Sequence, residues 1–153
     1  MNPTPSEWPR ISSALFYDDA AAAIEWLCKA FGFEVRLKVE GDGGRIEHSE
    51  LTYGDGLIMV ASAGGASDRS EPLPCRSPRS LGGVNTQSLC VYVDDVDGHC
   101  AAARAAGAKV LEAPKTDDYG EAYGTNRSYR ALDLEGHQWW FMKQLRAPQP
   151  HAS

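Results

Sequence analysis

One sequence pattern occurs twice in this chain of 153 residues. The first copy begins at Tyr17 and reads YDDAAAAIEWLCKAFGFEVRLKV; the second begins at Tyr92 and reads YVDDVDGHCAAARAAGAKVLEA. Each copy has a strand end, paired aspartates, a helical pattern, a glycine and a second apolar stretch, and Gly32 corresponds to Gly107. A unit that recurs in this way indicates a duplicated module whose two copies share one fold.

The first copy predicts a strand, a capped helix and three further strands. Asp18 and Asp19 are suited to cap a helix that begins near Ala20, and Gly32 is suited to end it. Apolar residues at helical spacing predict one buried stripe, made of Ile24, Leu27, Cys28 and Phe31. Apolar runs and turn residues predict strands at 11–17, 35–39, 45–53 and 57–61.

The second copy predicts the same order of elements. Asp94 and Asp95 take the capping position, and the helix turns Val96, Cys100 and Ala103 inward. A polar loop is expected at 114–126, and the strands are expected at 87–93, 109–113, 127–133 and 137–142.

The chain is therefore expected to form one domain of the α+β class, built from tandem β-α-β-β-β repeats. We expect five segments along it: an extended lead-in at 1–10, the first repeat at 11–63, a linker loop at 64–86, the second repeat at 87–145 and a tail at 146–153.

Composition excludes several classes of partner. The net charge is −6 and no cluster of Lys and Arg exists, so nucleic acid and anionic membranes are poor partners. No apolar run reaches the length of a membrane-spanning helix and no signal-like segment opens the chain, so a cytoplasmic location is expected. The four cysteines lack zinc-site spacing, and neither a disulfide nor a zinc framework is expected.

The motifs of both copies resemble one known family. The helix exits AFGFEV and AAGAKV, the motif VDDVD and the ending DLEGHQWWF resemble the vicinal oxygen chelate superfamily of glyoxalases, bleomycin-resistance proteins and extradiol dioxygenases. The ending resembles bacterial single-domain glyoxalase-like members, through Tyr123, Gly124, Arg127, Tyr129, Asp133, Glu135, Gly136, His137, Trp139 and Phe141. The resemblance implies a curved mixed sheet in each repeat, a cavity shared between the sheets, and a homodimer.

Metal-using members of that superfamily take up to four ligands from the first and last strands of the two repeats. Counting from the capping aspartates and the turn glycines places these positions at Ser12, Ser88, Val60 and Trp140. These side chains are not ligands for a divalent metal, and a shift of one residue adds only Gln87 as a credible donor. We therefore expect neither a metal nor another cofactor.

Every second residue of a strand faces the same side of the sheet, so each of these positions predicts further residues, two and four positions along the strand, on the same face. The predicted ligand-binding residues are Ser12, Phe16, Val60, Ser88, Tyr92, Gln138, Trp140 and Met142, with Tyr123 and Arg127 beside a glycine-containing loop. Aromatic and apolar walls with a few hydroxyl and amide groups suit a planar organic ligand. The alternative is that these side chains fill the core and that Tyr123 and Arg127 stabilise a turn.

His48 and Glu50 lie on one face of the predicted strand at 45–53. An imidazole beside a carboxylate is a candidate acid–base couple for catalysis, and the alternative is a solvent-facing pair. Of the other histidines of the repeats, His99 is expected to be structural and His137 to pack outside the cavity.

Without a metal, the resemblance favours bleomycin-resistance-type members, which bind a drug and sequester it. We therefore expect a protein that binds a hydrophobic or aromatic small molecule, with antibiotic sequestration as one such role. Two alternatives stay open: a metal-dependent lyase, isomerase or dioxygenase resembling glyoxalase, and a non-catalytic interaction protein with a filled cavity.

Overall fold

The structure is a computed structural model that describes residues 1–6 and 8–149. It separates into two compact units, with the boundary between Val84 and Asn85. The first unit contains β1 (Ser13–Tyr17), α1 (Ala20–Phe31), β2 (Glu34–Glu40), η1 (Asp42–Gly44), β3 (Ile46–Tyr53), β4 (Gly56–Ser62) and η2 (Pro78–Leu81). The second contains β5 (Ser88–Tyr92), α2 (Val96–Ala105), β6 (Lys109–Asp118), β7 (Thr125–Leu132) and β8 (Gln138–Arg146).

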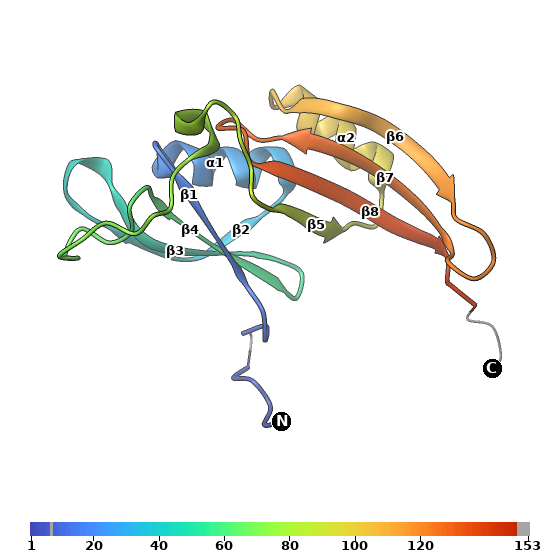
Figure 1. The fold of residues 1–153 in the computed structure, drawn as a ribbon, viewed down its shortest axis with the longest axis horizontal. Coiled ribbons are helices and arrows are strands. Elements are labelled where there is room, and N and C mark those ends of the chain that lie inside the picture. Colours follow the sequence, from blue (N-terminus) through green and yellow to red (C-terminus); the bar gives the residue numbers. More distant parts are fainter. Residues whose placement is uncertain (7, 150–153) are drawn as a thin grey trace. The chain divides into compact units, whose positions relative to one another are not determined.

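Each unit is a four-stranded mixed sheet with one helix against one face (Figure 1). The strand order is β1-β4-β3-β2 in the first unit and β5-β8-β7-β6 in the second. In both units the first strand is parallel to the last strand, and the remaining pairs are antiparallel. The predicted α+β class and tandem β-α-β-β-β order are confirmed.

The helix ends follow from their capping residues. The Asp19 carboxylate accepts a hydrogen bond of 3.1 Å from the backbone N–H of Ala22, and Gly32 ends α1 with a φ of 86°. In α2 the Asp95 carboxylate accepts from the Gly98 N–H at 3.0 Å. The expected inward residues of α2, which are Val96, Cys100 and Ala103, are all buried. In the expected stripe of α1, Cys28 is half-buried and the other three residues are buried.

Strand alternation gives every sheet a helix-facing side and an open face, by which we mean the side away from the helix. In β1, Leu15 and Tyr17 are buried whereas Ala14 is exposed. In β8, Trp139 and Phe141 are fully buried, and the Phe141 ring lies 4.4 Å from the ring of His99 on α2. The core of each unit is therefore the layer between its sheet and its helix.

Two elements of the second unit are longer than predicted. β6 continues to Asp118 through Pro114, so the expected loop at 114–126 is reduced to the residues between β6 and β7. Proline is tolerated there because β6 is an edge strand that pairs only with β7.

β8 likewise runs to Arg146, beyond the expected end at residue 142. The predicted tail is ordered as far as it is described: the Arg146 guanidinium pairs with Asp118 at 2.9 Å and the Gln149 N–H donates to the Glu121 carbonyl at 3.0 Å. The rest of that tail, residues 150–153, lies outside the described residues. No helix in the described part of the chain is long and apolar enough to span a membrane.

Candidate functional site

The open face of the second unit brings five predicted ligand-binding residues together. The parallel register of β5 and β8 pairs Ser88 with Gln138 and Tyr92 with Met142, and it places Cys90 beside Trp140. Tyr92 is 54% exposed although it lies within a sheet. This face is thus an aromatic and apolar surface bordered by hydroxyl, thiol and amide groups.

Arg130 on β7 completes this surface, and the sequence analysis missed it. Arg130 pairs with Trp140 across the β7–β8 ladder, and its guanidinium carbon lies 4.8 Å from the centre of the indole ring. Its Nε also lies 3.4 Å from a carboxylate oxygen of Glu112 on β6. The cation is therefore held between a carboxylate and an aromatic face. Period-two alternation along residues 127–133 could have identified it.

Cys90 is an exposed residue on this face. Partial burial of its thiol raises the pKa, and the nearby Arg130 cation acts in the opposite direction. The thiol is therefore present mainly in its protonated form at neutral pH, as an adaptable apolar contact rather than a nucleophile.

Arg127 and Tyr123 do not lie on the open face. The Arg127 side chain forms two hydrogen bonds to the Asp97 carboxylate of α2, at 2.7 and 2.6 Å, and a third to the Thr116 hydroxyl at 3.1 Å. It is one residue out of phase with Ser128 and Arg130, so it faces the helix. Tyr123 lies in the β6–β7 turn and is 75% exposed. The structure thus assigns Arg127 to the fastening of α2.

In the first unit, the position on β4 that was predicted by counting from the turn glycine, Val60, is wrong by one residue. Val60 is fully buried and pairs with Leu15, whereas Met59 pairs with Ala14 on the open face. The error comes from the hairpin turns. The β3–β4 turn closes with Tyr53 opposite Gly56, whereas five residues separate the paired ends of β7 and β8. The turn glycines of the two repeats are therefore not equivalent.

A pocket of about 260 Å³ lies on the open face of the first unit. Its floor comes from β1 and β4 and includes Phe16, one of the predicted ligand-binding residues, with Met59. The linker after β4 contributes the opposite wall, through Gly65, Ala66, Arg69 and Leu73. Ser12 directly precedes β1 and is half-buried.

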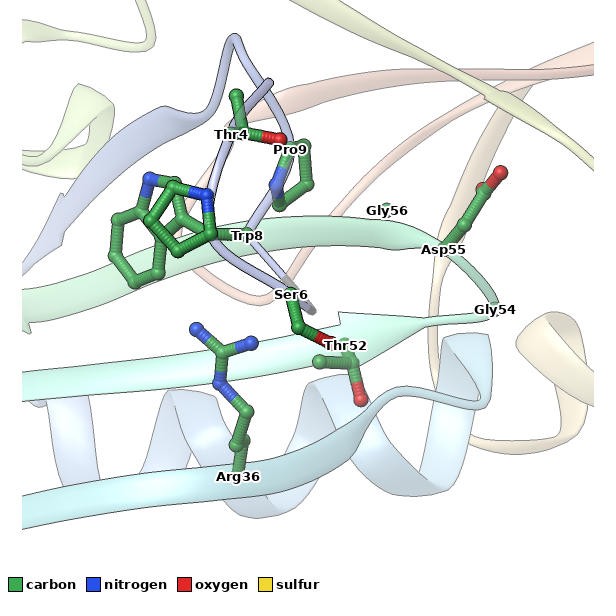
Figure 2. A pocket seen from close by; sticks show the side chains of 10 residues that line it. Thr4, Ser6, Trp8, Pro9, Arg36, Thr52, Gly54, Asp55 and Gly56 are labelled. Carbon is green, nitrogen blue, oxygen red and sulfur yellow. The ribbon is translucent and has the colours of Figure 1, made fainter. Parts of the chain in front are cut away.

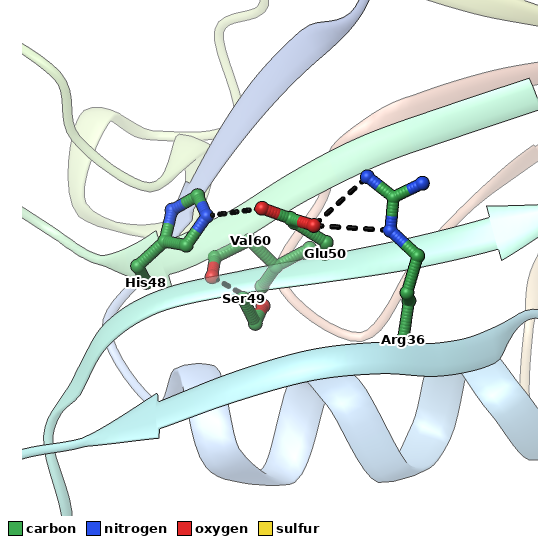
Figure 3. A network of polar contacts seen from close by, with 5 residues as sticks. All are labelled: Arg36, His48, Ser49, Glu50 and Val60. Carbon is green, nitrogen blue, oxygen red and sulfur yellow. Dashed lines mark hydrogen bonds and ion pairs between the residues drawn. The ribbon is translucent and has the colours of Figure 1, made fainter. Parts of the chain in front are cut away.

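The predicted pair His48 and Glu50 does meet (Figure 3), and His48 is also one of the residues that line this pocket. His48 Nε2 lies 2.9 Å from one Glu50 oxygen, and the other oxygen accepts hydrogen bonds from Arg36 Nε and Nη2 at 3.0 and 2.9 Å. The hydrogen bond with His48 lowers the pKa of Glu50 most, and those with Arg36 lower it further, while partial burial opposes them. Glu50 is therefore an anion at neutral pH.

The lead-in contacts the first unit through Trp8. The Trp8 ring lies 5.1 Å from the guanidinium carbon of Arg36 (Figure 2). Together with the β3–β4 turn, the lead-in borders a second pocket of about 810 Å³, lined by Thr4, Pro5, Ser6, Trp8, Pro9, Arg36, Thr52, Gly54, Asp55 and Gly56. Polar and apolar groups both contribute to this lining.

The side chains at the superfamily's metal positions do not fit a divalent cation. After correction of the register these residues are Ser12, Met59, Ser88 and Trp140, which supply no imidazole or carboxylate. Among the described residues, no group of three or more His, Cys, Asp and Glu side chains is arranged to hold a metal ion.

Curated relatives cover most of the chain. An uncharacterized protein of Mycobacterium bovis is 32% identical over 143 residues, which is 90% of this chain and 85% of the relative. An uncharacterized protein of Mycobacterium tuberculosis has the same identity over 90% of this chain and 76% of its own length.

Solved structures share the fold. TioX from Micromonospora sp. ML1 is 30% identical with a TM-score of 0.69, over 90% of this chain and all of that one. A glyoxalase/bleomycin resistance protein/dioxygenase from Alicyclobacillus acidocaldarius is 11% identical with a TM-score of 0.59, over 93% of this chain and 96% of that one. A family model matches residues 10–141. The chain belongs to the glyoxalase/bleomycin resistance protein/dioxygenase superfamily.

Proposed function

We propose that this protein binds a hydrophobic or aromatic small molecule on the open face of its second sheet, without a metal, and that it sequesters an antibiotic in this way. The observation that carries the proposal is the group formed by Tyr92, Trp140 and Arg130. Two aromatic side chains and a cation project from neighbouring strands, where the backbone ladder fixes their spacing.

Burial and charge support this choice. A Tyr that is 54% exposed on a strand can lose further apolar surface to a ligand, and a stacked aromatic pair contributes about 0.5–1.5 kcal/mol beyond burial. Arg130 is already oriented by Glu112 and Trp140, so its guanidinium loses little additional freedom when it contacts a ligand. We expect the ligand to be planar, and an acidic group on it to bind near Arg130.

The proposal includes a homodimer located in the cytoplasm; the dimer is what the superfamily resemblance implies. The net charge of −6 supports a partner that is a small molecule rather than a nucleic acid or an anionic membrane.

Two fluorescent probes test the proposed site, the neutral N-phenyl-1-naphthylamine and the anionic 8-anilinonaphthalene-1-sulfonate. Loss of one stacking contact in Trp140→Ala should raise Kd for both probes about 2- to 12-fold, which corresponds to 0.5–1.5 kcal/mol. Arg130→Gln should weaken the anionic probe more than the neutral one. Bleomycin is then titrated by calorimetry as a drug of the class that the family name contains.

Tyr119→Ala is the matched control, since Tyr119 is an exposed aromatic residue outside the open face of the second sheet. It should bind both probes as the wild type does. Equal Kd values for the wild type and Trp140→Ala would contradict the proposed site.

A further inference from the structure

We propose that residues 64–73, which we call the flap, are a hinged cover of the 260 Å³ pocket of the first unit, held shut by Arg45 and Glu47. A small molecule then enters or leaves this pocket when the flap opens. This device goes beyond ligand binding on the second sheet and uses none of the residues placed there. It is therefore tested independently of the proposed function.

The flap is a loop whose two ends are joined at its base. The Leu73 N–H donates to the Gly64 carbonyl at 2.7 Å, and the Gly64 N–H donates to the Cys75 carbonyl at 3.0 Å. Four of the ten flap residues line the pocket: Gly65, Ala66, Arg69 and Leu73. The rest of the lining comes from strands of the sheet. Movement of the loop about its base therefore opens one side of the pocket and leaves the sheet in place.

Two hydrogen bonds, which we call the latch, hold the flap against the sheet. Arg45, directly before β3, donates from Nη2 to the Gly65 carbonyl at 2.5 Å, and Glu47 on β3 accepts from the Ser67 N–H at 2.6 Å. The hydrogen bonds with Ser67 lower the pKa of Glu47 most, and partial burial opposes them. Glu47 is therefore an anion at neutral pH, and its bond to the flap is charge-assisted.

The latch leaves two of its own polar atoms unsatisfied. Arg45 Nε and Glu47 Oε1 are buried and have no hydrogen-bond partner among the described residues. They lie 3.9 Å apart, which is beyond hydrogen-bond distance. A buried polar atom without a partner raises the free energy of the closed arrangement, and it regains hydrogen bonds to water when the flap opens. The cost of opening is reduced accordingly, as suits a cover that opens and closes.

Burial and backbone conformation both favour movement about Gly64 and Gly65. Of the ten flap residues only Gly65 is buried, and residues 67–72 are all exposed, so little apolar packing opposes opening. Gly64 and Gly65 have φ values of 86° and 84°, a left-handed conformation that glycine enters and leaves without a steric penalty. A Cβ at Gly65 would also lie 2.9 Å from the Leu73 side chain in the closed flap. The two glycines therefore form the hinge.

The chain on either side of the flap is anchored. Before it, the Ala63 N–H donates to the Tyr17 carbonyl at 2.9 Å, which ties the end of β4 to β1. After it, Ser77 is fully buried, and Arg79 Nε lies 3.5 Å from a carboxylate oxygen of Asp18. Motion is thus confined to residues 64–73, and the latch determines how often the pocket is open.

A thiol placed on the pocket floor reports flap opening. Ala61→Cys introduces it at a half-buried position that lines the pocket, and this variant serves as the parent. N-ethylmaleimide labels the thiol, and peptide mass spectrometry separates its rate from those of the four native cysteines. Addition of Glu47→Ala should raise the rate about 3- to 10-fold, because the loss of one hydrogen bond increases the open population. Arg45→Ala should act in the same direction.

Asp118→Ala is the matched control, because the Asp118 carboxylate accepts a loop N–H in the second unit, that of Gly120 at 2.9 Å. It should leave the labelling rate of the introduced thiol unchanged. Cys100 is buried in the second unit and reports global unfolding, so its labelling should stay as slow as in the parent. The proposal is overturned if Glu47→Ala, folded by circular dichroism, labels the introduced thiol no faster than the parent, or if labelling of Cys100 accelerates to the same extent.

Discussion

Truncation of Val60 tests the register that locates the open face of the first unit. The Val60 side chain is fully buried in the core of its unit, with 0% of its surface exposed to solvent. Its neighbour Met59 is half-buried and lines the 260 Å³ pocket. Val60→Ala removes two buried methyl groups, and at about 0.8 kcal/mol each it should lower the free energy of unfolding by about 1.6 kcal/mol before any cavity term.

For a chain of this size, that change corresponds to a Tm about 3–6 °C lower, measured by circular dichroism. Met59→Ala is the matched comparison. Because its thioether is already partly in water, we expect a loss below about 1 kcal/mol, although it removes more atoms. A larger loss in Met59→Ala than in Val60→Ala would refute the register and move the candidate pocket to the other face of β4.

Three further predictions concern named contacts. Tyr129→Phe removes the hydroxyl that lies 2.6 Å from His99 Nδ1 in the buried layer, and we expect a loss of about 1–3 kcal/mol in chemical denaturation. Arg127→Ala removes the two hydrogen bonds to Asp97 at an exposed site; a small loss, about 0–1 kcal/mol, is expected, with unchanged binding of both naphthalene probes. Because the pKa of Glu50 is lowered in the folded protein, its ionic contribution is present above the ordinary value of 4.5 and is lost as pH falls through the folded pKa. The stability difference between wild type and Glu50→Gln, measured by urea unfolding, should therefore shrink below pH 4.5, and a difference that grows there would contradict this assignment.

The repeat made much of the fold predictable. Paired aspartates, an apolar stripe and a following glycine are local signals, so the start of α1 and its end at Gly32 were predictable from sequence alone. The same holds for the inward residues of α2, because helical spacing determines which face is buried.

The side of a strand that a residue faces was harder to predict. Period-two alternation converts an error of one residue into the opposite face, and the unequal turns before β4 and β8 caused that error at Val60. In the same way, Arg127 lies out of phase with Arg130 and contacts α2 instead of the open face.

Contacts between segments far apart in the chain were not predictable from local pattern. The pairing of Arg130 with Trp140 depends on the β7–β8 register, and Trp8 reaches Arg36 from a lead-in with no periodic signal. The pair His48 and Glu50 was suggested by spacing, but the role of Arg36 depends on its place opposite β3 at an irregularity in β2.

Native mass spectrometry of the freshly purified protein tests the proposed function most directly. We expect a protein without a stoichiometric metal that carries a small organic molecule, and we expect Trp140→Ala to lose this molecule while Tyr119→Ala retains it. Stoichiometric nickel, zinc, iron or manganese, or an organic molecule retained equally by Trp140→Ala, would contradict it.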